Sequence, residues 1–231
     1  ELVAWTDGAG RAAPGLAMTD DEYDVVLASG EQVTAGLLAL TLRNLGLDAR
    51  SWMGWQIPII TDGAHGRARI DDVPGEVLGA AIDAGQIAVV PGFQGVSRDG
   101  RITTLGRGGS DTSAVAVASA LDCPCDIYTD VDGVYTTDPR IESRARRLEK
   151  VSYEEMLEMA SLGAKVLQTR SVELAMAKRV PLRVLSSFIE PDADGILPLK
   201  SGTLICDEDE IVEKRIVSGV TMSRDEARIS L

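Results

Sequence analysis

The sequence TTLGRGGSDT occupies residues 103–112 and joins an expected β-strand to an expected α-helix through three glycines. Glycine tolerates positive φ angles and lets a ligand approach the backbone, while the first turn of a helix carries unpaired N–H groups. Arg107 can bind a carboxylate through two hydrogen bonds, and Ser110 or Asp111 can cap the helix. The stretch predicts an anion site, with a tight turn beside an exposed arginine as the alternative. It matches neither the Walker nor the dinucleotide-binding glycine pattern.

A second segment, YTDVDGVYTTDPR at residues 128–140, begins at the end of an expected strand and continues into a turn with three acids, a tyrosine and an arginine. Ligands of open α/β sheets bind at the carboxyl ends of strands, where this segment is expected. A calcium loop is excluded because Pro139 occupies the position of its last glutamate. The segment is compatible with either a ligand-binding turn or a surface loop rich in Asp, Gly and Pro.

Two single charged residues are further candidates, each with an ordinary alternative. Glu31 follows Ser29 and Gly30 where a glycine breaks a helical pattern, and it can equally be a first-turn acid that favours the helix dipole. Lys165 lies between an expected helix and the next element, and it can equally be a solvated lysine.

Short apolar runs alternate with helical patterns along the chain, which predicts an α/β fold: a three-layer α/β/α sandwich with a largely parallel central sheet. We expect a hairpin turn at 98–101 and a loop at 190–202. The expected helices are 20–45 with an interruption near 29–31, 74–84, 110–121, 152–159 with a capping box, and 170–178. The expected strands are 86–90, 126–129, 182–185, 203–205 and 215–220.

Composition excludes several classes of protein. The 231 residues include 36 acids and 23 bases, and the net charge of −13 argues against a nucleic-acid partner. With one histidine, His65, multi-histidine metal centres are excluded. The three cysteines, Cys123, Cys125 and Cys206, are expected to be reduced. No apolar run reaches the length of a membrane span and no signal peptide opens the chain, so we expect a cytoplasmic protein without a membrane partner.

Taken together, these segments resemble the catalytic domain of aspartate kinases, in the amino-acid-kinase superfamily. The resemblance covers nearly the whole chain in the family's order, and the combination of GRGGSDT at 106–112 with DVDGVYTTDPR at 130–140 is its most specific part. It is also carried by SGE at 29–31, GFQG at 92–95, LEMA at 157–160 and GAKVL at 163–167. It implies phosphoryl transfer from ATP, with Mg²⁺, to the β-carboxylate of L-aspartate, the first step toward lysine, threonine and methionine.

The resemblance also implies roles for individual residues. Glu31 would bind the ammonium group of aspartate and Arg107 its α-carboxylate. The other positions lining the aspartate site are Gly108, Gly109, Ser110 and the catalytic Asp111. The ATP-contacting positions are Thr129, Asp130, Tyr135, Arg140, Lys165 and Val166. No metal ligand is assigned.

The family pattern also bears on domain organisation. We expect an amino-acid-kinase domain at 1–205, and at 206–231 a linker with the first strand of a truncated ACT regulatory domain. The family's opening motifs, approximately KFGGTS and SAMG, are not found, so we expect a piece of a longer, homo-oligomeric and allosteric enzyme, inactive alone. The open alternatives are another acceptor within the superfamily and a non-catalytic nucleotide- or amino-acid-binding regulator of the same fold.

Overall fold

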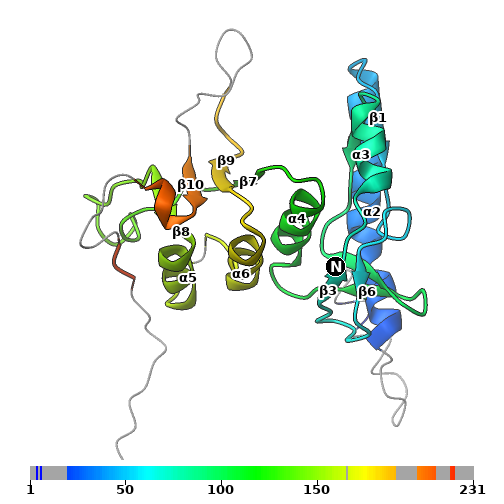
Figure 1. The fold of residues 1–231 in the computed structure, drawn as a ribbon, viewed down its shortest axis with the longest axis horizontal. Helices are drawn as coiled ribbons and strands as arrows, with labels where there is room; N and C mark the ends of the chain where they lie inside the picture. Colours follow the sequence, from blue (N-terminus) through cyan, green and yellow to red (C-terminus); the bar gives the residue numbers. More distant parts are fainter. Residues whose placement is uncertain are drawn as a thin grey trace, which may run out of the picture. The chain divides into compact units, whose positions relative to one another are not determined.

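The computed structural model describes residues 4, 6, 20–164, 166–190, 202–211 and 219–221. By the density of its internal contacts the chain divides into two compact units, Glu1–Leu121 and Asp122–Leu231. Figure 1 shows the elements of each unit, blue to green in the first and green to orange in the second. Each unit is described by itself.

The first unit packs helices against two small sheets. Strands β1 (Ala49–Ser51) and β4 (Ile87–Val89) pair in parallel, and the second sheet has the strand order β3-β2-β5-β6. The strands of that sheet are β2 (Ile60–Thr61), β3 (Ile70–Asp72), β5 (Gln94–Ser97) and β6 (Ile102–Thr104). The helices are α2 (Asp20–Asn44), α3 (Glu76–Asp83) and α4 (Gly109–Ala120). The antiparallel β5–β6 pair confirms the predicted hairpin turn and leads directly into the glycine-rich turn.

Helix α2 corrects one prediction from the sequence, because it runs without interruption from Asp20 to Asn44. Gly30 does not break it: the Thr34 hydroxyl donates to the Gly30 carbonyl and the Ser29 hydroxyl to that of Val26, so both polar side chains bond within the helix. One glycine costs a helix only about 1 kcal/mol relative to alanine, and the tertiary packing of α2 outweighs that cost. Glu31 therefore lies mid-helix and not in a first turn.

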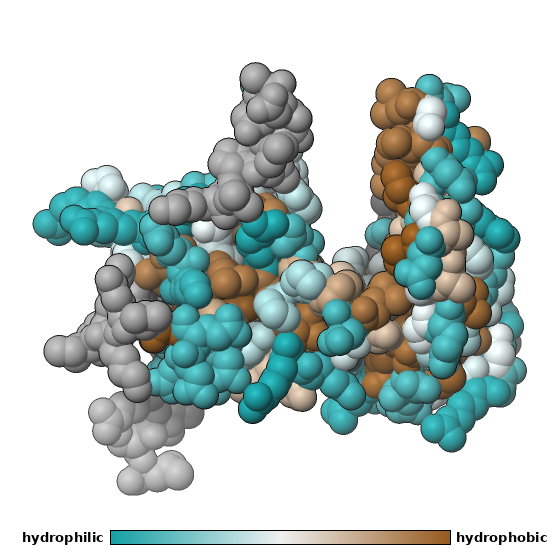
Figure 2. Space-filling model, turned by 45° about the horizontal axis from the view of Figure 1, so that its top comes forward, coloured by the Kyte–Doolittle hydropathy of each residue, from teal (hydrophilic) through white to brown (hydrophobic). Residues whose placement is uncertain are grey.

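Helix α2 is also long and apolar enough to cross a membrane by length and composition, although no membrane span was predicted from the sequence. In this structure its contacts lie within the first unit, where it packs against β1 and β6 and buries the Asp24 carboxylate among polar groups. Val33, Leu37 and Leu40 of α2 stay exposed, and Figure 2 shows hydrophobic side chains at the surface of this unit.

The second unit is built on one mixed sheet with the strand order β7-β9-β10-β8. Its strands are β7 (Cys125–Thr129), β8 (Lys150–Ser152), β9 (Leu182–Ser186) and β10 (Thr203–Cys206). Helices α5 (Tyr153–Ser161) and α6 (Thr169–Lys178) pack against each other, and the short 3₁₀ helix η1 (Glu208–Glu210) follows β10. Reciprocal hydrogen bonds between Ser152 and Glu155 confirm the predicted capping box of α5.

The α/β fold class predicted from the sequence is confirmed, with a sheet arrangement that periodicity did not show. Within the described residues, four strand pairs are parallel and three are antiparallel. The antiparallel pairs arise at the β5–β6 hairpin, at β2–β3 and at β10, which inserts between β9 and β8. Most of the expected loop at 190–202 and most of the expected strand at 215–220 lie outside the described residues.

Candidate active site

The glycine-rich turn between β6 and α4 adopts the conformation that its sequence predicts. Gly106 and Gly108 have φ angles of 73° and 70°, in the left-handed region where glycine avoids steric cost. Helix α4 begins at Gly109 with Gly108 as its N-cap, and no side chain caps it. The predicted capping by Ser110 or Asp111 is therefore wrong, because the helix starts before either residue and both lie inside its first turn.

Close packing holds this turn against the segment that precedes β5. A Cβ at Gly109 would lie 2.8 Å from Cβ of Leu105 and 2.9 Å from Cδ2 of Phe93, so no larger residue fits there. The Phe93 amide donates to the Ser113 hydroxyl in α4, and its carbonyl accepts from the Leu105 amide. The start of α4 is thus fixed against residues 92–95.

Glu31 and Arg107 are the oppositely charged side chains predicted to hold an amino acid. Both are exposed, and within the described part of the chain neither forms an ion pair. Glu31 lies on α2 and Arg107 in the turn that follows β6, and α2 packs against β6 in the first unit. Unpaired, solvated charges of opposite sign are available to a zwitterionic ligand.

Gln94 on β5 is one of two buried polar residues that connect α2 to the hairpin preceding Arg107. Its side chain is almost fully buried, accepts a 2.9 Å hydrogen bond from the Gln32 amide, and donates to the Ala28 carbonyl. Gln94 is also paired with Thr104 across the β5–β6 hairpin. The Ala28 carbonyl and the Gln32 side chain, on either side of Glu31, are therefore joined to the strand pair that leads into the turn with Arg107.

Asp24 is the second of these residues, and it is not among the site residues predicted from the sequence. Its carboxylate is fully buried and accepts hydrogen bonds from the Thr104 amide and hydroxyl, from the Gly66 amide and from Nδ1 of His65. The available signal was an acid in helical register with the small apolar residues Ala28 and Ala35, because a buried carboxylate needs compensating donors.

The predicted nucleotide contacts lie in the second unit, from the end of β7 onward. Thr129 is the last residue of β7, and its hydroxyl donates to the exposed Asp130 carboxylate. The Tyr135 hydroxyl donates to both carboxylate oxygens of Asp132 at 3.1 Å. Burial, together with that hydrogen bond, raises the pKa of Tyr135, so its hydroxyl keeps its proton at neutral pH.

Arg140 is exposed and makes a two-point ion pair with Asp138. Its Nε and Nη2 atoms lie 3.0 and 2.8 Å from the two carboxylate oxygens of Asp138. These hydrogen bonds lower the pKa of Asp138 and raise that of Arg140, so both groups are charged at neutral pH. The pair uses one edge of the guanidinium and leaves Nη1 for an anion.

The turn at 132–134 is supported by a strand far away in sequence. Gly133 has a φ angle of 147°, and a Cβ there would lie 2.6 Å from the Thr203 hydroxyl and 2.8 Å from Cδ of Arg147. The Val134 amide donates to the Thr203 hydroxyl, which donates in turn to the Leu148 carbonyl.

Two further predicted nucleotide contacts are Lys165 and Val166. Val166 is partly buried, whereas Lys165 lies outside the described residues.

The acids around 130–138 accept hydrogen bonds from neighbouring side chains. Asp132 is engaged by Tyr135 and Asp138 by Arg140, and within the described ranges no three metal-ligating side chains come together. Magnesium in kinase sites is bound by one or two carboxylates together with the substrate phosphates, so no such group of three is required.

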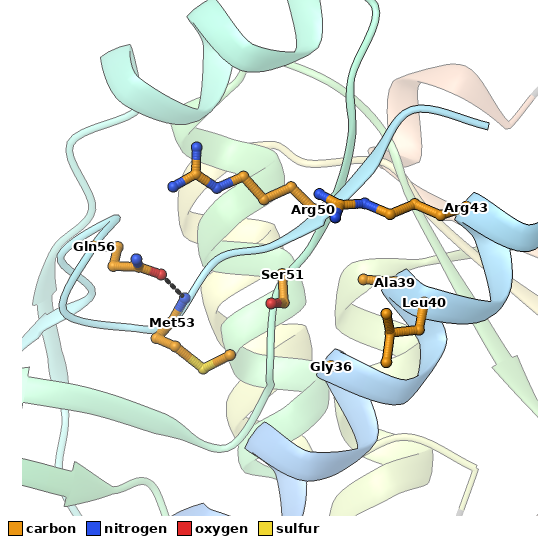
Figure 3. A pocket seen from close by; sticks show the side chains of 8 residues that line it. All are labelled: Gly36, Ala39, Leu40, Arg43, Arg50, Ser51, Met53 and Gln56. Carbon is orange, nitrogen blue, oxygen red and sulfur yellow. Dashed lines mark hydrogen bonds between the residues drawn. The ribbon is translucent and has the colours of Figure 1, made fainter. Parts of the chain in front are cut away.

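A pocket of about 460 Å³ in the first unit lies apart from these residues. Figure 3 shows it between the second half of α2 and the segment that starts at β1, with Arg43 and Arg50 extended along it. Arg43 donates to the Ala49 carbonyl and Arg50 stacks on the Trp52 ring, so contacts within the unit hold both guanidinium groups. None of the predicted site residues lines this pocket.

The fold, the glycine-rich turn at the start of α4 and the acidic turn after β7 are matched by a known family. The model of the amino acid kinase family matches residues 6–186, and the chain belongs to that family. Curated relatives named aspartate kinase or aspartokinase include proteins of Pseudomonas fluorescens, 53% identical over 91% of this chain and 49% of that protein, and Bacillus subtilis, 49% identical over 91% of this chain and 50% of that protein.

Solved structures give the same result. Aspartokinase III of E. coli in complex with aspartate and ADP has a TM-score of 0.74 at 34% identity, covering 89% of this chain and 45% of that one. UMP kinase of Bacillus anthracis has a TM-score of 0.58 at 21% identity, covering 86% of this chain and 75% of that one, and shares the fold. The chain spans about half the length of the curated relatives it matches.

Proposed function

We propose that the protein is an aspartate kinase, which transfers the γ-phosphoryl group of ATP to the β-carboxylate of L-aspartate. The observation that carries the proposal is the pair of exposed, oppositely charged side chains, Glu31 and Arg107, on two elements joined by the same buried residues. Curated relatives at 53% identity that are named aspartate kinase support it.

In this proposal the first unit binds aspartate through the α-ammonium and α-carboxylate groups of that amino acid. The Glu31 carboxylate pairs with the ammonium, and the Arg107 guanidinium binds the α-carboxylate through two hydrogen bonds. Gly108 lets the ligand approach the backbone, and Gly109, packed on Leu105 and Phe93, sets where α4 begins beside Ser110. The N-terminus of α4 favours the negative charge of the ligand. Asp111, in the first turn of α4, is the proposed catalytic residue that organises the reacting groups.

The second unit supplies the proposed nucleotide contacts. Arg140, held by Asp138, presents its unused guanidinium edge to the phosphates. The Tyr135 hydroxyl, whose proton is donated to Asp132, offers its oxygen to the nucleotide as a hydrogen-bond acceptor. Thr129, Asp130, Lys165 and Val166 complete the proposed set. Mg²⁺ arrives on the ATP phosphates and lowers their negative charge.

The chemistry requires no general base. A β-carboxylate oxygen of aspartate forms the new bond to Pγ, the bond from Pγ to the bridging oxygen breaks, and ADP leaves with that electron pair. No proton changes place, because the nucleophile is already an anion. The protein accelerates the step by aligning two anions and by stabilising charge on the phosphoryl group, which suits a site with cations and N–H donors.

We also infer the organisation of the larger enzyme. Residues 1–205 form the amino-acid-kinase domain, which agrees with the family match over 6–186, and residues 206–231 lead into an ACT domain. A cytoplasmic homo-oligomer is proposed for the full-length protein. Regulation by an amino acid is proposed because the E. coli relative is solved with lysine and aspartate in a T-state.

The test is acyl-phosphate trapping with the full-length gene product. Hydroxylamine converts an aspartyl phosphate into a coloured hydroxamate, so aspartate-dependent colour with MgATP is the expected result. The alternative acceptors are tested one at a time by measuring the release of ADP. Little turnover is expected with glutamate, acetylglutamate or UMP. A folded, nucleotide-binding preparation that makes no hydroxamate would instead support the non-catalytic regulator.

A further inference from the structure

We propose that Asp24 is a positioning residue: its buried carboxylate fixes the turn that carries Arg107 against the helix that carries Glu31, and so determines the affinity for the amino-acid substrate. The inference rests on the proposed function and deepens it, because Asp24 touches no substrate and acts through Arg107 and Glu31.

The Asp24 carboxylate accepts hydrogen bonds from three residues, His65, Gly66 and Thr104. Its Oδ2 accepts from Nδ1 of His65 and from the Thr104 amide, both at 2.9 Å, and its Oδ1 accepts from the Thr104 hydroxyl. The Gly66 amide lies 3.1 Å from both oxygens. A carboxylate with no exposed surface is stable only with such a complete set of donors, so the arrangement has one geometry.

Those donors lie next to the turn that carries Arg107. Thr104 ends β6 three residues before Arg107, and its carbonyl accepts from the Ala68 amide at 2.9 Å. The Gly66 carbonyl lies so close to Gly106 that a Cβ there would be 2.9 Å away. Asp24 therefore holds the strand that enters the turn and the loop that packs on it.

The same residue is rigidly connected to Glu31. Glu31 follows Asp24 by seven positions on one uninterrupted helix. This spacing places Glu31 about 10 Å further along α2 and at nearly the same angle around the helix axis. A shift of Thr104 relative to Asp24 would change the distance between the two charges that clasp the substrate. A misplacement of about 1 Å caused by a mutation far from the chemistry can lower an enzyme's rate by about 100-fold.

The test compares steady-state kinetics of the full-length gene product and two matched variants on α2. Asp24→Asn replaces a carboxylate oxygen with a donor that faces other donors, and we expect the KM for aspartate to rise at least about tenfold, while the KM for ATP changes less than about twofold. Asp21→Asn is the control, because Asp21 pairs with the partly exposed Arg101 at the unit surface and should leave both constants unchanged.

A second pair keeps the proposal testable if Asp24→Asn does not fold. Thr104→Val removes the hydroxyl donor at constant shape and should raise the KM for aspartate, whereas Thr104→Ser keeps the hydroxyl and should restore it. An unchanged KM for aspartate in folded Asp24→Asn, or in Thr104→Val where only that pair folds, overturns the proposal, as do equal rises for aspartate and ATP. A wild-type protein without aspartate-dependent turnover overturns the proposed function instead.

Discussion

At the scale of single residues, the two guanidinium groups proposed to bind substrates differ in their partners. Arg140 is oriented by a two-point pair with Asp138, whereas Arg107 makes no ion pair with another described side chain. Arg107 thus depends on the backbone of its turn for its position, and its function should be sensitive both to its own chemistry and to the turn's support.

The first prediction concerns Arg107. Arg107→Ala should raise the KM for aspartate at least about tenfold, because one charge-assisted two-point contact contributes about 1.5–3 kcal/mol or more. The KM for aspartate of Arg107→Lys should lie between the values of the wild type and of Arg107→Ala, since an ammonium lacks the planar pair of donors. Steady-state kinetics with aspartate and ATP varied separately measures both, and Arg98→Ala, at an exposed arginine of the same unit, should change neither constant.

The second prediction concerns Gly133. Gly133→Ala forces a Cβ into the Thr203 hydroxyl and the Arg147 side chain at a φ angle of 147°, and should lower the free energy of unfolding of the second unit by about 1–3 kcal/mol. Denaturant unfolding followed by Tyr fluorescence measures the change. A change of less than about 0.5 kcal/mol would show that the turn relaxes easily.

At the scale of elements, the long helix α2 carries both an anchor and an open surface. Gly36 lies inside the helix with nothing near its missing Cβ, while Gly46 follows the helix at a φ angle of 83°, also in open space. Alanine at Gly36 reports helix propensity and alanine at Gly46 reports backbone strain, because neither added Cβ meets a neighbouring atom.

The third prediction uses that pair. Gly36→Ala should stabilise the protein by about 0.5–1 kcal/mol, since alanine loses less backbone freedom in a helix. Gly46→Ala should destabilise it by about 1 kcal/mol because an L side chain is strained at positive φ. Thermal unfolding of both variants gives the comparison, and identical shifts in Tm would contradict it.

The fourth prediction concerns the start of α5. Ser152→Ala removes the acceptor for the Glu155 amide and should cost about 1 kcal/mol in the free energy of unfolding. Ser161→Ala, at the exposed end of the same helix, should change it little. Urea unfolding of the two variants shows whether the loss of stability comes from the cap hydrogen bond or from replacing any serine of this helix by alanine.

Sequence periodicity predicted the strongly patterned elements and failed where tertiary contacts decide. The capping box at Ser152 and the strand at 126–129 were predictable, because each depends on residues close in sequence. The continuity of α2 through Gly30 and the insertion of β10 between β9 and β8 depend on partners elsewhere in the chain. Asp24 was missed for the same reason, since its donor at Thr104 is 80 residues away.

At the scale of the whole molecule, the proposed substrate contacts separate by unit. Glu31, Arg107 and the start of α4 belong to Glu1–Leu121, and the residues after β7 belong to Asp122–Leu231. The division predicts that each substrate alone should order one unit's residues more than those of the other.

The fifth prediction tests this division by hydrogen–deuterium exchange on the full-length gene product. Aspartate alone should slow exchange around 92–113 and 24–32, and ADP alone should slow it around 129–140, because bound ligands suppress local opening. Protection by aspartate confined to the second unit would contradict the assignment of Glu31 and Arg107.

The hydrogen bond between Val134 and Thr203 also determines when, during synthesis of the chain, the turn at 132–134 can become fixed. The two residues are 69 positions apart, so a ribosome releases the turn at 132–134 long before the strand that braces it. Until β10 has been synthesised, the Val134 amide must rely on water, and the turn has no fixed form. Nascent chains that stop short of Thr203 should therefore be unable to retain nucleotide, however complete their earlier helices are.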